Sequence, residues 1–262
     1  MPVSLALLER GRVGVAVASL AMIAGCSAAP GPTERQAIVP PEPVVDEVSA
    51  DPSIEAPSEG PLVAVAYDIT SASSITVVVT KRRPLSPSSY VPSELVALSG
   101  IPGGSGHQMR KEAAAAMTRM YEGADAAGVP FRISTAYRSY GFQQNLHSRE
   151  VTQKGLAAAD SLVARPGYSE HQTGLTADVY DVPANELNQR FGESGAGVWI
   201  RDHAHEYGFI VSYPDGSQSV TGYVYEPWHV RYVGEGVAAD MHETGVATLQ
   251  EYFDVEDSPT YE

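Results

Sequence analysis

Two short motifs hold the residues whose types and spacing could support hydrolytic chemistry. SEHQTGLTAD at residues 169–178 contains His171 and Asp178, and EPWH at residues 226–229 contains Glu226 and His229. A catalytic zinc takes three ligands from histidine nitrogen and carboxylate oxygen and leaves a fourth position for water. His171, Asp178 and His229 would fill that role, provided the fold brings the two motifs together.

Glu226 is the candidate general base of such a site. A metal-bound water has its pKa lowered towards neutrality, so a nearby carboxylate can take its proton and deliver it to a departing amine. Positions i and i+3 of a regular strand point to opposite faces. Glu226 and His229 can therefore converge only if Pro227 accompanies a bend or bulge.

The same residues also have a plain structural interpretation. A lone histidine near a glycine is more often a surface or hydrogen-bonded residue than a ligand, and EPWH could equally be a turn with a buried indole. Arg138, in AYRSYGFQ, could be a salt-bridged surface arginine, although it ends a predicted strand in a loop, where active groups gather. The residues alone therefore indicate a zinc hydrolase and go no further.

The elements that must position these residues come in mixed order. Helical spacing of apolar residues predicts a helix over 108–128, with Gly128 at its C-terminal cap. Further helices are predicted over 141–153 (ended by Gly155), 156–164, 199–208 (ended by Gly208) and 236–252, and strands over 62–67, 75–80, 131–137, 209–213, 222–226 and 228–233. Without βαβ regularity or repeats, this order favours an α+β fold with an antiparallel sheet.

Composition limits the classes of partner. The chain has 262 residues, 43% of them apolar and 19% charged, which is enough for one domain with a sizeable core plus appendages. Its formal charge of −15 would repel phosphate backbones, so nucleic acid is not an expected partner.

The N-terminal region predicts export. Arg10 and Arg12 precede an apolar run over 13–24, and the following Cys26, in IAGC, is the only cysteine. IAGC resembles the lipobox of bacterial lipoproteins, which implies a signal peptide over 1–25 and lipidation of Cys26. An ordinary secretory signal followed by a free cysteine is the alternative.

The segment after Cys26 reads as a tether. Residues 26–61 are rich in proline and acidic residues and predict an extended linker, and residues 62–262 form the predicted catalytic domain. Acyl chains on Cys26 would hold this domain at the outer face of the bacterial cytoplasmic membrane.

Taken together, the motifs resemble those of the bacterial LAS metallopeptidases, in particular VanY-type D-alanyl-D-alanine carboxypeptidases and LdcB-type L,D-carboxypeptidases. SEHQTGLTAD is similar to their SxHxxGxAxD motif and EPWH to their ExxH motif. KRRPLSPSSYVPSELV, AYRSYGFQQNL, HAHEYGFIVSYP and TGYVYEPWHVRYVG are similar to other family blocks, in family order. The resemblance implies the LAS (hedgehog/DD-peptidase-like) fold, a central antiparallel sheet with flanking helices, and one zinc ion held by His171, Asp178 and His229.

The resemblance also implies roles for other residues. Glu226 matches the catalytic glutamate, and Arg138 matches an arginine that steadies the carbonyl oxygen or engages the terminal carboxylate. Ser169 and Gln143 match substrate contacts of the family. Thr176 stands where the motif has alanine, and Ser212 stands where the RYP block has arginine. The Thr176 hydroxyl could hydrogen-bond Asp178 or crowd it, and neither outcome removes a ligand. Ser212 bears on substrate preference more than on catalysis.

The implied reaction is removal of the C-terminal D-alanine from a peptidoglycan stem peptide by a monomeric enzyme. D,D-cleavage of a pentapeptide is the first expectation. L,D-cleavage of a tetrapeptide remains an alternative, since no motif reads the stereocentre beside the scissile bond. A non-catalytic zinc-containing cell-wall binding module is the other alternative.

Overall fold

The structure, a computed structural model, describes residues 66–181 and 187–262. The predicted signal peptide, the lipidation site at Cys26, the linker and most of the strand predicted over 62–67 lie outside these residues. Within the described part of the chain, no helix combines the length and apolar character that crossing a bilayer requires.

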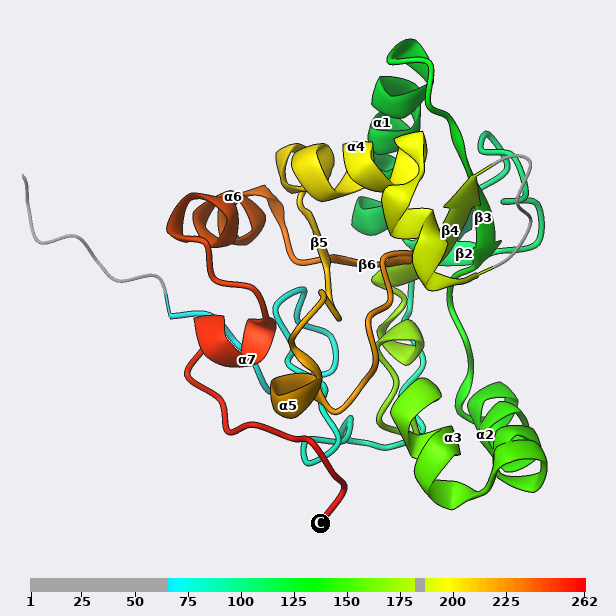
Figure 1. Cartoon of the computed structure of the whole chain (residues 1–262), viewed down its shortest axis with the longest axis vertical. Helices are drawn as coiled ribbons and strands as arrows, with labels where there is room; N and C mark the ends of the chain where they lie inside the picture. The colour runs from blue at the N-terminus through cyan, green and yellow to red at the C-terminus, as the bar shows by residue number, and fades with distance from the viewer. Residues whose placement is uncertain (1–65, 182–186) are drawn as a thin grey trace, which may run out of the picture. The chain divides into compact units, whose positions relative to one another are not determined.

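A four-stranded antiparallel sheet carries the two motifs (Figure 1). Its strands lie in the order β3, β4, β6 and β5, with bounds Phe131–Thr135, Thr176–Asp181, His229–Tyr232 and Phe209–Val211. The register of β4 against β6 places Asp178 directly opposite His229. A separate two-stranded sheet pairs β1 (Leu95–Ala97) with β2 (Gln108–Arg110). This arrangement confirms the predicted α+β class with an antiparallel sheet.

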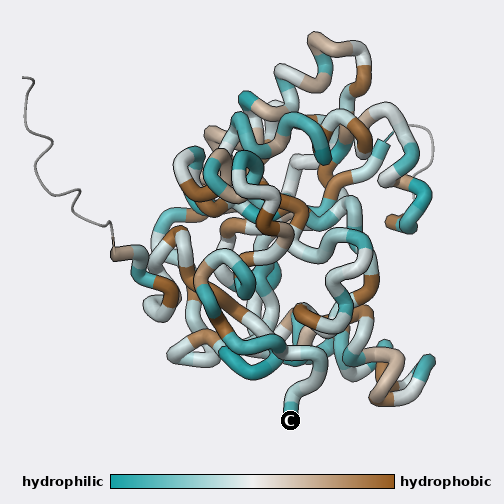
Figure 2. The backbone as a smooth tube through the Cα atoms, turned by 60° about the vertical axis from the view of Figure 1, so that its left-hand side comes forward, coloured by the Kyte–Doolittle hydropathy of each residue, from teal (hydrophilic) through white to brown (hydrophobic). Residues whose placement is uncertain are grey.

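Helices α1 (Lys111–Ala126) and α4 (Gly195–His203) lie together beside the sheet (Figure 1). The apolar face of α1 packs into the main core, which also contains residues of the sheet and of α4. Figure 2 shows several hydrophobic stretches in the central part of the tube. The 3₁₀ helix η3 (Ala204–Tyr207) continues α4 and ends at Gly208, whose φ of +80° is the left-handed cap that the sequence predicts.

A helical hairpin follows β3. Ser139 caps α2 (Tyr140–Lys154) by accepting a hydrogen bond from the Phe142 amide, and Gly155, at φ +83°, separates α2 from α3 (Leu156–Leu162). The short 3₁₀ helix η1 (Glu170–Thr173) then leads into β4. Both helices of the hairpin confirm the sequence prediction, because cap residues mark their ends.

The remaining helices are short. They are η2 (Gln189–Glu193), α5 (Gln218–Thr221), α6 (Glu235–Thr244) and α7 (Leu249–Tyr252). The single helix predicted over 236–252 is wrong, because Gly245 takes a left-handed φ of +71° and ends α6. Thr248 then starts α7 with a capping box.

The strand predicted over 75–80 is also wrong. These residues form an irregular segment in which Val78 packs in one apolar cluster while Val77 and Val79 pack in another. The carbonyl of Val77 accepts a hydrogen bond of 3.1 Å from the Arg231 guanidinium, in place of a ladder partner. Alternating valines predict a strand, but here they pack into two separate apolar clusters on either side of a buried loop.

The strand predicted over 222–226 is wrong for a related reason. Gly222, at φ +79°, ends α5, and the residues after it hydrogen-bond to separate segments. The Val224 amide donates to Ser161 (3.2 Å) and the Glu226 amide to Tyr213 (3.0 Å). No single neighbouring strand supplies the acceptors, so no ladder forms there.

Candidate active site

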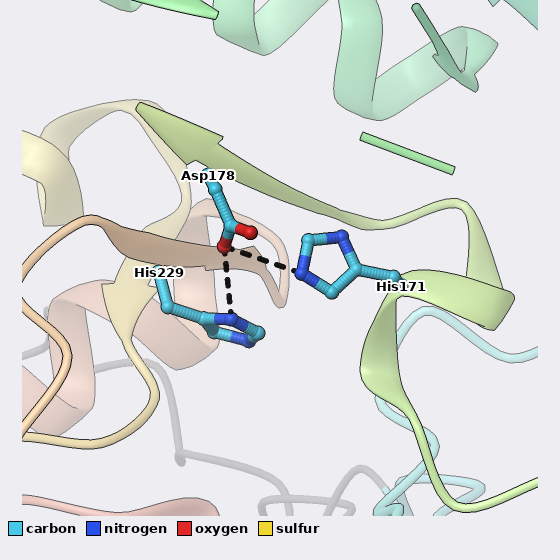
Figure 3. A group of neighbouring side chains, drawn as sticks. All are labelled: His171, Asp178 and His229. Atoms are coloured by element: carbon cyan, nitrogen blue, oxygen red, sulfur yellow. Dashed lines mark ion pairs between the residues drawn. The ribbon is translucent and has the colours of Figure 1, made fainter. Parts of the chain in front are cut away.

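His171, Asp178 and His229 converge in the interior. They come from η1, β4 and β6, and one ligand atom from each lies within 4.8 Å of the others. Asp178 Oδ1 is 3.2 Å from His171 Nε2 and 3.2 Å from His229 Nδ1, and all three side chains point towards one another (Figure 3). The fold therefore brings together the three residues that the sequence singles out.

The hydrogen bonds of the two imidazoles leave one nitrogen of each facing the centre of this cluster. His171 Nδ1 donates to the Ala136 carbonyl at 2.7 Å, and His229 Nε2 donates to Glu170 Oε2 at 2.9 Å. Both acceptors are oxygens without hydrogens, so they fix the ring proton on the outward nitrogen. His171 Nε2 and Asp178 Oδ1 are buried and have no hydrogen-bond partner among residues 66–181 and 187–262. Two inward imidazole nitrogens and a carboxylate are a donor set that fits Zn²⁺.

Glu170 is a site residue that the sequence reasoning missed. Its buried carboxylate binds His229 through one oxygen and Arg231 through the other, with 3.3 Å between Arg231 Nη1 and Glu170 Oε1. Strand alternation offered a signal, because His229 and Arg231 share one face of β6. A buried arginine on that face requires a carboxylate partner, and Glu170 adjoins the motif histidine.

Glu226 sits in a turn that leads into β6. The His229 amide donates to the Glu226 carbonyl at 3.0 Å, so Pro227 and Trp228 occupy the middle of the turn. Glu226 Oε2 then lies 3.7 Å from His229 Nδ1. The turn supplies the bend at Pro227 that the sequence requires for Glu226 and His229 to converge.

Burial and neighbouring charge set the protonation of the cluster. Burial raises the pKa of the Glu226 carboxyl to about 8 and, with the Arg138 charge, lowers the pKa of His171 to about 4. Burial also disfavours protonated His229, but its contacts with Asp178 and Glu170 raise its pKa to about 9. The cluster thus favours a positive charge beside Asp178.

Arg138 lies on the other side of Asp178. Its Nη2 is 3.7 Å from Asp178 Oδ2, and its backbone amide donates to the His171 carbonyl at 3.3 Å. The Arg138 Nε atom is buried and has no hydrogen-bond partner among the described residues. The guanidinium is therefore held at the site with donor capacity to spare.

A cavity opens beside these groups. Its lining comprises Arg138, Leu162, Val163, Ala164, Ser169, His171, Tyr213, Tyr223, Glu226 and His229. Ser169 is thus at the cavity, as the sequence predicts. Gln143 is not part of the lining and lies behind Ala164, donating from its Nε2 to the Ala164 carbonyl at 2.7 Å. It supports the wall of the cavity from behind.

The two departures from the family motifs are both buried. Thr176 lies two residues before Asp178, on the same face of β4, and its hydroxyl has no hydrogen-bond partner among the described residues. Ser212 lines a small internal cavity together with Glu170 and Tyr213, and its hydroxyl likewise has no such partner. Neither side chain displaces a residue of the His171, Asp178 and His229 cluster.

Comparison with known proteins places this site in a family. Residues 102–235 match the family described as VanY: D-alanyl-D-alanine carboxypeptidase. The putative carboxypeptidase YodJ of Bacillus subtilis (strain 168) is 39% identical over 191 residues, which are 71% of this chain and 69% of YodJ.

Two solved structures extend the likeness to the fold. The LdcB LD-carboxypeptidase has a TM-score of 0.63 and 38% identity, covering 71% of this chain and 88% of that chain. A Zn(II) complex of the vancomycin resistance D,D-pentapeptidase VanY has a TM-score of 0.58 and 28% identity, covering 68% and 97%. The chain therefore belongs to the VanY family and is a carboxypeptidase of the VanY and LdcB type.

Proposed function

We propose that this carboxypeptidase is zinc-dependent and removes the C-terminal D-alanine from peptidoglycan stem peptides by D,D-cleavage. The observation that carries the proposal is the convergence of His171, Asp178 and His229 beside Glu226, at a cavity that both histidines and Glu226 line. A metal site of this kind, with a carboxylate next to it, suits hydrolysis of an amide bond.

His171 Nε2, Asp178 and His229 Nδ1 are the groups that would hold the ion. Zinc bound there supplies Lewis acidity and a water of lowered pKa. Glu170 and the Ala136 carbonyl keep the two imidazoles in the tautomer that such binding requires. The zinc-bound VanY structure supports the choice of metal.

Glu226 acts as general base and then as general acid. Its carboxylate takes the proton of the attacking water and returns it to the nitrogen of the departing D-alanine. The turn that carries Glu226 holds Oε2 3.7 Å from His229 Nδ1, at the cation site but outside its ligand set. Burial raises the pKa of the Glu226 carboxyl above its ordinary value, which makes its carboxylate a stronger base.

Arg138 binds the negative charge of the substrate. Arg138 lines the cavity, and its guanidinium charge suits the terminal carboxylate of the peptide or the oxyanion that develops at the scissile carbonyl. Ser169, in the same lining, would offer a hydroxyl to the substrate.

L,D-cleavage of a tetrapeptide is the second candidate. The LdcB LD-carboxypeptidase is 38% identical to this chain, against 28% for the D,D-pentapeptidase VanY structure. The family description favours D,D-cleavage, and the structure of higher sequence identity favours L,D-cleavage. The configuration of the residue before the scissile bond is therefore the variable to test.

We further propose that the enzyme is a monomeric lipoprotein, tethered by Cys26 at the outer face of the cytoplasmic membrane. The lone cysteine in IAGC and the proline-rich acidic linker over 26–61 support this location. A tether of this composition gives the catalytic domain reach into the cell wall. Mass spectrometry of the membrane-extracted protein should find diacylglyceryl on Cys26; a free thiol there would contradict it.

The function is tested by incubating the zinc-loaded protein with a pentapeptide stem and a tetrapeptide stem and identifying the products by mass spectrometry. We expect loss of one D-alanine, and Glu226→Gln should lower kcat by about 10²- to 10⁴-fold with the zinc content unchanged. Glu243→Gln, an exposed change on α6, is the matched control and should keep full activity. If neither peptide is cut, or if Glu226→Gln is as active as the control, the proposal fails.

A further inference from the structure

The C-terminal segment 256–262 contacts residues of the cavity wall from outside the family match. The family match covers residues 102–235, so this segment is not part of it. The segment leaves α7 and passes α5 (Figure 1), where the Ser258 amide donates to the Val220 carbonyl at 2.7 Å. Its contacts therefore add something to this site that the family likeness does not supply.

Two buried groups fix the path of the segment. Ser258 is fully buried, and its hydroxyl lies 3.0 Å from the Thr80 hydroxyl. Lys81 is also buried and donates from Nζ to the Gly222 carbonyl at 2.5 Å and to the Pro259 carbonyl at 3.4 Å. A cation that joins two carbonyls from different segments ties the tail to the residue preceding Tyr223.

Tyr261, held in this way, contacts two parts of the cavity wall. Its hydroxyl is 3.2 Å from the Tyr223 hydroxyl, and it accepts a hydrogen bond of 2.8 Å from the Arg165 amide. Tyr223 lines the cavity, and Arg165 directly follows the lining segment 162–164. One phenol oxygen thus joins two wall segments that are distant in sequence.

The ring of Tyr261 is fixed as firmly as its hydroxyl. The Arg165 guanidinium lies 4.1 Å from the ring centroid, and the Tyr168 ring meets it edge-on at 5.1 Å. Arg165 is itself held by Asp160 through hydrogen bonds of 3.1 and 2.7 Å. The hydroxyl of Tyr261 therefore has little freedom to leave its two partners.

We propose that Tyr261 is a positioning residue, which holds Tyr223 and the segment 162–164 in the geometry that binds the terminal D-alanine of the peptide. The proposal rests on the proposed function of the cavity. Tyr261 is not itself part of the cavity lining, so it acts through Tyr223 and Arg165. Removing its hydroxyl should weaken substrate binding and leave the chemical step intact.

The test compares Tyr261→Phe with Tyr252→Phe in the full chain. Tyr252 is the matched control, because its hydroxyl also forms a hydrogen bond, which it donates to Asp240 at 2.6 Å. Tyr252 is not part of the cavity lining. Tyr261→Phe should raise KM for the cleaved peptide roughly 3- to 10-fold, the size of one hydrogen bond, with kcat within about twofold. Tyr252→Phe should leave both constants unchanged.

A double variant and an exchange measurement separate positioning from general stability. In a Tyr223→Phe background, adding Tyr261→Phe should raise KM by less than it does in the wild type. Hydrogen exchange of the Arg165 amide should become faster in Tyr261→Phe and stay unchanged in Tyr252→Phe. Equal KM for the two single variants, or full additivity in the double variant, would overturn the proposal.

Failure of the proposed function gives a different result. A wild-type protein that cuts neither peptide rejects the peptidase, and the exchange measurement then decides the positioning role on its own. Faster exchange of the Arg165 amide only in Tyr261→Phe supports the positioning role of Tyr261, and equal exchange in both variants rejects it.

Discussion

At the scale of single residues, Glu170 shows how the site depends on groups that do not face the substrate. It binds the outward nitrogen of His229 and is itself held by the buried Arg231. A carboxylate in this position fixes the ring, selects the tautomer and increases the basicity of the inward nitrogen. Zinc binding would therefore depend on Glu170 as well as on the three residues that would contact the ion.

The first prediction concerns this carboxylate. Glu170→Gln should lower the zinc affinity of the protein by about 10- to 100-fold, because the amide is a weaker acceptor for His229 and leaves Arg231 without a charged partner. Competition with a chelating dye measures the affinity. Glu206→Gln, at an exposed pair with His203, is the control and should bind zinc as the wild type does. Equal affinity in both variants would show that Glu170 does not tune the ligand.

Residue by residue, the sequence predicts the groups with chemical signatures and misses those that support them. His171, Asp178, Glu226 and His229 stand out because their side-chain types occur together in two motifs. Glu170 lies inside one of those motifs, but its role depends on the partners that the sheet places around it. Tyr261 has no local signal at all, because its contacts with Tyr223 and Arg165 form only in the folded chain.

At the scale of elements, local signals predict α2 and the strands β3, β5 and β6, but they mislead where pairing or a cap decides, at 75–80, 222–226 and 236–252. Ser139 and Gly155 mark the ends of α2, and Gly128, at φ +78°, follows α1, so these helices are predictable from cap chemistry. The segment 75–80 has the alternation of a strand but no neighbouring strand to pair with. Pairing is a tertiary property, which is why the valines predict the wrong element.

Lys81, which anchors the C-terminal segment, yields a prediction at this scale. Burial lowers the pKa of Lys81 to about 8, below its ordinary value of 10.5. Between these values the folded state releases a proton that the unfolded state keeps, so raising the pH favours folding. The free energy of unfolding of the wild type should thus increase relative to Lys81→Met as the pH rises from about 8 to about 10.

Urea unfolding of both proteins at pH 7.5 and pH 10 measures this difference. Lys154→Met, at an exposed lysine of α2, serves as the control and should show no relative change between the two pH values. A wild type that loses stability relative to Lys81→Met over this range would mean that the buried ammonium is stabilised by its carbonyl and aromatic neighbours more strongly than burial penalises it.

At the scale of the whole molecule, the His171, Asp178 and His229 cluster joins separate parts of the chain. His171 lies in η1, Asp178 on an inner strand and His229 on the strand beside it. An ion bound only by the folded state stabilises the fold by mass action. Zinc at about 1,000 times its dissociation constant should therefore add about 4 kcal/mol to the free energy of unfolding.

Thermal unfolding with zinc and with a chelator tests this coupling. The melting temperature should rise with zinc in the wild type and in Glu226→Gln, because Glu226 is outside the ligand set. His229→Ala should abolish the rise, whereas His242→Ala, an exposed histidine of α6, should keep it. A rise that survives in His229→Ala would place the ion elsewhere.

The turn over residues 226–229 keeps the candidate general base apart from the candidate metal ligands. Asp178 and His229 are paired across a strand ladder, while Glu226 stands one turn outside it. Exchanging that one acid for a neutral residue changes no side chain of the His171, Asp178 and His229 cluster. On this geometry, one substitution is enough to uncouple the cluster from turnover.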